Sequence, residues 1–96
     1  MMTEDTHMTT ATLQAYQRAQ HAMADLKVAV FEVLSVAGPA GLRNADIGRS
    51  LGIYSGHEEH EGHIPRTILA MMQAEGVVGQ DPDSKRWRLL SHFTKM

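Results

Sequence analysis

The chain has 96 residues, of which 43% are hydrophobic and 21% charged, and its formal net charge is −2. This length fits one domain with a modest core, and the apolar fraction excludes an intrinsically disordered chain. The absence of cysteine excludes disulfides, thiolate metal sites and a cysteine nucleophile. No apolar run approaches the roughly 20 residues that span a bilayer, and the first ten residues lack the regions of a signal peptide. We therefore expect a cytoplasmic protein without a membrane partner.

The sequence predicts a flexible arm over residues 1–9 and a single domain over residues 10–96. The domain begins with one long helix. Between about Thr10 and Val36 the chain has no Gly or Pro, and apolar residues recur at helical spacing. These apolar positions are Leu13, Tyr16, Met23, Leu26, Val30, Val33 and Leu34. Thr9 or Thr10 is suited to cap the start of the helix, and the Gly-Pro-Ala-Gly turn at 38–41 ends it.

A continuous helix of this length would be about 40 Å long, which is more than a domain of this size can cover. In one alternative, the helix breaks near Ala24–Asp25 and bends back over its own domain. In the other, its first half, with Leu13, Tyr16 and Met23, pairs with a second subunit. We expect a homodimer through this helix, since two linked modules bind a shared ligand far more tightly than one.

Two shorter helices are predicted after the turn. Leu42 is expected to be a short extended residue, and Asn44 resembles the N-cap of a helix over 45–51 that ends at Gly52. A further helix is predicted from Pro65 to Glu75, with Pro65 in its first turn.

The C-terminal runs 77–80 and 85–90 predict a β-hairpin, because they are joined by the turn sequence Asp-Pro-Asp-Ser. Alternation along the second run places Trp87 and Leu89 on one face and the two flanking arginines on the other. Trp87 is therefore expected in the core.

The order helix, extended residue, helix, helix and hairpin resembles a winged helix-turn-helix domain of bacterial transcription regulators over residues 26–90. The matching segments read LKVAVFEVLSVAGPAGL, NADIGRSLGI, HIPRTILAMMQAEGVVGQ and DPDSKRWRLL. The most specific part is a helix followed by Glu-Gly, Val-Val, a turn and a strand with basic and aromatic residues. The resemblance implies a mainly α fold with a small β-hairpin wing, double-stranded DNA as partner, no cofactor and no catalysis.

In such a domain the helix over 65–75 enters the major groove and reads base edges with its N-terminal residues, while the wing rests on the backbone. The residues that the resemblance and their chemistry nominate for DNA contact are Arg43, Arg49, Tyr54, Ser55, His57, His63, Arg66, Thr67, Gln73, Lys85, Arg86 and Arg88. Arg66 is the strongest candidate, because a guanidinium can donate two hydrogen bonds at once to guanine or to a phosphate. Any other single Arg or Lys is more often a solvent-exposed side chain without a DNA contact than a residue that contacts DNA.

The connection over 52–64 departs from the family pattern, in which three or four residues join the two helices. Three interpretations compete for it. His57, His60 and His63 have the spacing of Zn²⁺ or Ni²⁺ ligands. Alternatively the segment lies against DNA, where protonated histidines would tighten binding below about pH 6.5. The third interpretation is a surface insertion without chemistry, and we favour the last two over the metal site.

No Gly-rich phosphate loop, Ser/His/Asp spacing or carboxylate pair indicates an enzyme. We expect a small transcriptional regulator or an accessory factor of a DNA-processing system. The alternative is a winged-helix module that docks a protein partner and no nucleic acid. Residues 43–96 hold seven basic and seven acidic side chains, so binding by bulk charge is excluded and DNA contact would rely on a few placed arginines.

Overall fold

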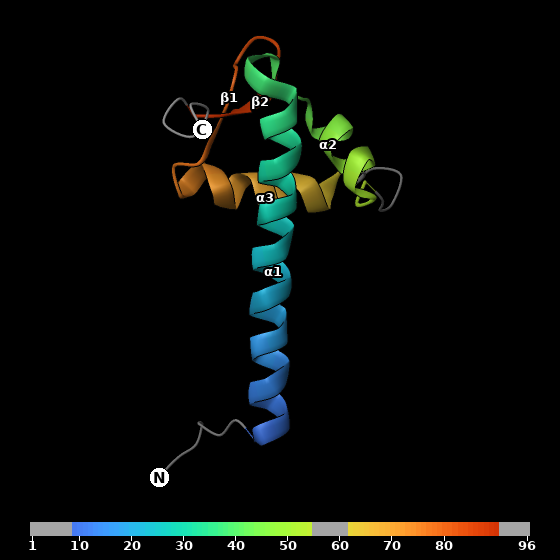
Figure 1. Cartoon of the computed structure of the whole chain (residues 1–96), viewed down its shortest axis with the longest axis vertical. Coiled ribbons are helices and arrows are strands. Elements are labelled where there is room, and N and C mark those ends of the chain that lie inside the picture. Colours follow the sequence, from blue (N-terminus) through green and yellow to red (C-terminus); the bar gives the residue numbers. More distant parts are fainter. Residues whose placement is uncertain (1–8, 55–61, 91–96) are drawn as a thin grey trace.

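The computed structural model describes residues 9–54 and 62–90. In these ranges the elements are α1 (Thr10–Ala37), the short 3₁₀ helix η2 (Gly38–Ala40), α2 (Asn44–Leu51), α3 (His63–Ala74), β1 (Val78–Gln80) and β2 (Trp87–Leu89). The expected mainly α fold with a C-terminal hairpin is confirmed. Figure 1 shows α3 crossing α1, with α2 and the hairpin on opposite sides of α1.

α1 is one unbroken helix of 28 residues. Thr9 caps it as predicted, because its Oγ1 accepts a hydrogen bond from the Thr12 amide at 3.0 Å. The alternative with a break near Ala24–Asp25 is wrong, since nothing in this stretch interrupts the ladder of backbone hydrogen bonds. The first half of α1 instead extends away from the rest of the domain (Figure 1).

The core lies where the three α-helices and the hairpin meet. Its buried members are Val30, Leu34, Ile47, Ile68, Leu69, Met72, Val78, Trp87 and Leu89. Each such side chain contributes about 1.5–3 kcal/mol when fully buried. Met23 and Leu26 pack at the edge of this cluster, so the predicted stripe on α1 is a core face only in its second half.

The hairpin pairs β1 with β2 in antiparallel register, with Val78 opposite Leu89. Leu42 adds a third, single-residue partner: its N–H donates to the Trp87 carbonyl at 2.9 Å and its carbonyl accepts from the Trp87 N–H at 2.7 Å. The strands are shorter than predicted. Val77 still belongs to the turn after α3, and Lys85 has a φ of 66°, which is incompatible with a strand.

The starts of α2 and α3 also differ from the sequence prediction. Arg43, not Asn44, is the N-cap of α2, and its amide donates to Asp46 Oδ2 at 3.3 Å. The Asn44 side chain donates instead to the carbonyl of Gly62 at 3.1 Å. α3 begins two residues before Pro65, which still lies in the first turn as expected. Among the described helices, none combines the length and the apolarity that crossing a bilayer requires.

Candidate nucleic-acid interface

α3 has one buried and one exposed face. Pro65, Ile68, Leu69 and Met72 are buried, and this spacing turns the opposite face to solvent. The residues exposed there are His63, Arg66, Thr67, Ala70 and Gln73. The Thr67 hydroxyl donates to the His63 carbonyl at 2.9 Å. This face carries a cation and several polar groups and no carboxylate, which is the chemistry that an anionic partner requires.

Glu75 lies just beyond the C-terminal end of α3, next to this face. It is bound to Lys27 of α1, whose Nζ donates to Glu75 Oε2 at 2.6 Å. The two side chains are partly exposed, so the pair contributes at most about 1 kcal/mol to stability. The ion pair with Lys27 nevertheless neutralises the negative charge of Glu75 at the C-terminal end of α3.

The turn of the hairpin is ordered by Asp81. Its Oδ2 accepts from the amides of Ser84 at 2.6 Å and Asp83 at 3.1 Å. Hydrogen bonding from Ser84, with smaller contributions from Asp83 and the charge of Arg88, lowers the pKa of Asp81 below its usual value. Lys85 and Arg88 are exposed beside this turn, so the hairpin presents two cations to solvent.

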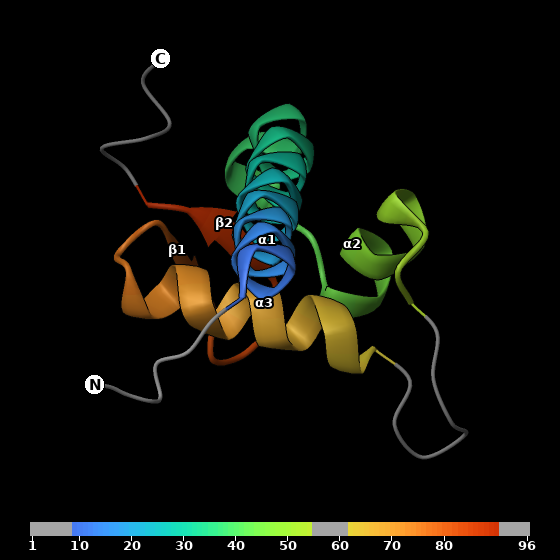
Figure 2. The same cartoon turned by 90° about the horizontal axis from the view of Figure 1, so that it is seen from below.

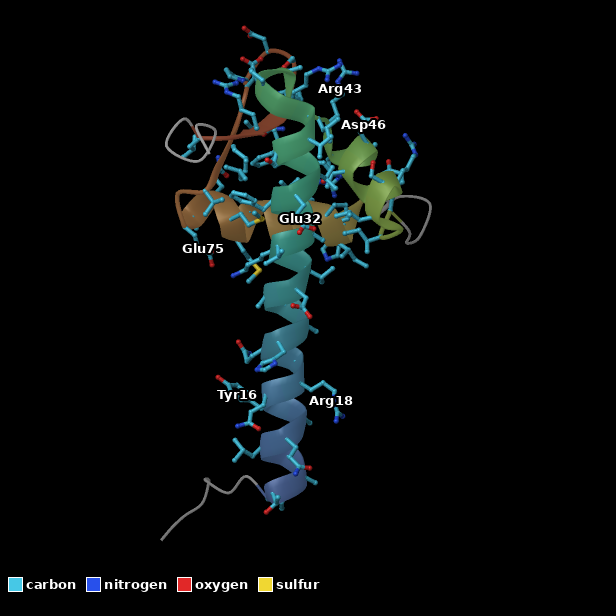
Figure 3. All side chains as sticks on the ribbon, viewed as in Figure 1. Tyr16, Arg18, Glu32, Arg43, Asp46 and Glu75 are labelled. Carbon is cyan, nitrogen blue, oxygen red and sulfur yellow. The ribbon has the colours of Figure 1, made fainter. Side chains whose placement is uncertain are left out.

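Arg43 and Arg86 are used differently from the other predicted contacts. Arg86 is half-buried and its Nη1 donates to the Gly41 carbonyl at 3.1 Å. Arg43 lies at the end of the molecule that holds the hairpin turn (Figure 3), and its Nε donates to the Ser84 carbonyl at 3.4 Å. Both arginines therefore fasten the hairpin to the segment before α2.

Tyr54 and Arg49 form a packed unit at the end of α2. The Arg49 guanidinium lies 4.6 Å from the centre of the Tyr54 ring, a cation–π distance. The half-buried ring contacts Gly48 and Gly62 so closely that a Cβ on either glycine would overlap it. Together with the bond from Asn44 to Gly62, this contact fixes both ends of the connection between α2 and α3. Gly48 is the sequence signal for the contact with Tyr54, because a glycine inside a short helix lowers its stability unless another residue packs against it.

Ser55, His57 and His60 lie outside the described residues, as do the three glutamates between and after the histidines. His63 is the described member of the predicted histidine set. Within residues 9–54 and 62–90, no group of three or more ligand-type side chains is placed to hold a metal ion.

The exposed cations predicted to contact DNA are carried by α3 and by the hairpin. Figure 2 shows α3 and the hairpin turn on the same side of α1. The arrangement of helices and hairpin is compatible with a winged helix. No protein-family model, no curated protein and no solved structure matches the chain.

Proposed function

We propose that this chain is a non-catalytic DNA-binding protein of the winged-helix type, either a small transcriptional regulator or an accessory factor of a DNA-processing system. The observation that carries the proposal is the solvent face of α3. It presents Arg66 together with His63, Thr67 and Gln73, and it carries no carboxylate. A helix with such a face can enter the major groove without electrostatic repulsion.

In this mechanism the two parts of the interface have different tasks. Arg66 and the side chains beside it contact base edges or phosphates from α3. Lys85 and Arg88 contact the backbone from the hairpin, where a charge gives affinity without sequence preference. Arg43 and Arg86 act indirectly, since their bonds to Ser84 and Gly41 set the position of the hairpin.

A salt titration with short duplex DNA tests the proposal, with fluorescence anisotropy as the readout. Affinity should fall steeply as salt rises, because each phosphate contact releases counterions. Arg66→Ala should weaken binding by about 1–3 kcal/mol, and Arg88→Ala should reduce the salt slope by about one. Arg18→Ala removes the same charge from the distant half of α1 and serves as the matched control.

The proposal is contradicted if the wild-type chain fails to bind duplex DNA at low salt, or if Arg18→Ala weakens binding as much as Arg66→Ala.

The second candidate function is a protein-docking module. An apolar groove between α1 and α2 favours it, lined by Val33, Val36 and Leu42, with the Val36 side chain 89% exposed. Absence of DNA binding at low salt would leave this candidate in its place.

A further inference from the structure

The first half of α1 presents apolar side chains to solvent. Every residue from Thr10 to Ala22 is exposed, and the core begins only at Met23. Leu13 is 45% exposed and Tyr16 52%. Helices shorter than about 12–15 residues are marginal in water when nothing packs against them. This half of α1 therefore gains no stability from packing within its own domain, and its apolar side chains are available to a second surface.

One stripe, apolar except for Gln20, runs along α1 from this exposed half to the body of the domain. Its members recur three or four residues apart and are Leu13, Tyr16, Gln20, Ala24, Val28 and Phe31. Val28 is 53% exposed. Figure 3 shows Tyr16 on the same side of α1 as Glu75, and Arg18 on the opposite side. The stripe thus points along α1 toward the C-terminal end of α3.

The stripe ends in an apolar cleft of about 200 Å³ between α1, α3 and the turn that follows α3. Its walls are Lys27, Val28, Phe31, Met72, Glu75 and Val77. The salt bridge between Lys27 and Glu75 lies at the cleft and leaves no unpaired charge from these two residues there. An apolar side chain is the occupant that such a cleft favours.

We propose that a second copy of this chain covers the stripe, with the two α1 helices antiparallel and Leu13 of each chain in the cleft of the other. Pairing centred near residue 22 sets Leu13 opposite the partner's Phe31 and Tyr16 opposite the partner's Val28. Because the symmetry is two-fold, the same contacts form in both directions and both clefts are filled.

The stripe is symmetric about residue 22, so a two-fold pairing brings apolar side chains against apolar ones, which favours a second copy over an unrelated protein. Leu13 and Phe31 are 18 positions apart in the sequence, or about 27 Å along the helix, so one stripe matches the other without overhang. The pairing places Gln17 opposite the partner's Lys27, and Gln20 opposite the partner's Ala24, so no like charges meet. One helix face and one cleft per chain form a small interface, for which we expect a dissociation constant on the order of micromolar.

Sedimentation velocity of the full chain between about 1 and 100 μM tests the proposal, and the expected result is a monomer–dimer equilibrium. Leu13→Asp should raise the dimer dissociation constant at least about tenfold, and Val28→Asp should do the same from the other side of the contact. Ala22→Asp introduces the same charge on the exposed opposite face and should leave the constant unchanged. A monomer throughout this range, or equal effects of Leu13→Asp and Ala22→Asp, overturns the proposal.

Disulfide trapping tests the antiparallel pairing, because the natural chain has no cysteine. A mixture of Gln20→Cys and Ala24→Cys chains should form a mixed disulfide, whereas Gln20→Cys alone should not. A parallel pair would set Gln20 against itself, and cross-linking of Gln20→Cys alone would therefore overturn the antiparallel arrangement. The inference does not depend on DNA binding, so a dimer that binds no DNA contradicts only the proposed function.

Discussion

At the scale of single residues, Gly41 is the position where backbone geometry and packing coincide. Its φ of 71° favours glycine, and a Cβ there would collide with the Trp87 carbonyl that accepts from Leu42. Gly38 has nearly the same backbone conformation and open space around it. We expect Gly41→Ala to lower the free energy of unfolding by about 1–3 kcal/mol more than Gly38→Ala, measured by urea denaturation. Equal costs would mean that the contact with Trp87 is unimportant.

The contrast between the arginines shows what residue-level reasoning from sequence cannot supply. Arg43, Arg66, Arg86 and Arg88 carry the same chemistry, and all were expected at a DNA interface. Arg43 and Arg86 fasten the hairpin only because Leu42 pairs with Trp87, 45 positions later in the chain. Local patterns carry no information on such a long-range pairing. The buried Trp87 was predictable, since strand alternation alone places it on the inner face.

At the scale of elements, the turn of the hairpin depends on the ionised form of Asp81. Hydrogen bonding from Ser84 lowers its pKa in the folded chain, so its contribution to stability is present above the unfolded pKa of about 3.9 and is lost as pH falls through the folded value. The difference in unfolding free energy between the wild type and Asp81→Asn should be constant above about pH 4 and shrink at lower pH. A difference that persists unchanged to pH 2 would contradict this.

The elements themselves follow from local signals, and their ends do not. Apolar spacing and the Gly-Pro turn were sufficient to predict α1, and the buried positions of α3 lie where helical periodicity placed them. α3 nevertheless begins at His63, because Gly62 has a φ of 82° and its carbonyl accepts from Asn44. That contact joins two elements, so the pattern around Pro65 alone could not locate it. The second strand begins later than the sequence predicts, because the left-handed Lys85 lengthens the turn.

At the scale of the whole molecule, the domain and the first half of α1 have different sources of stability. The core from Met23 onward holds the helices and the hairpin together within one chain. In the proposed dimer, the exposed stripe on residues 13–24 is buried by a second copy. Sequence periodicity did indicate that α1 is longer than its domain. The cleft that ends the stripe is built from α1, α3 and the turn after α3 together, so no single segment of the sequence indicates it.

The proposed dimer predicts that the stability of the chain depends on its concentration. Because only folded chains form the dimer, mass action stabilises the folded state as the protein concentration rises. The thermal midpoint of the wild type should therefore increase between about 1 and 100 μM, while that of Leu13→Asp should stay constant. Ala22→Asp should follow the wild type, since its charge lies on the face away from the stripe. Thermal midpoints that do not change with concentration in all three chains would show that α1 does not pair with a second copy in solution.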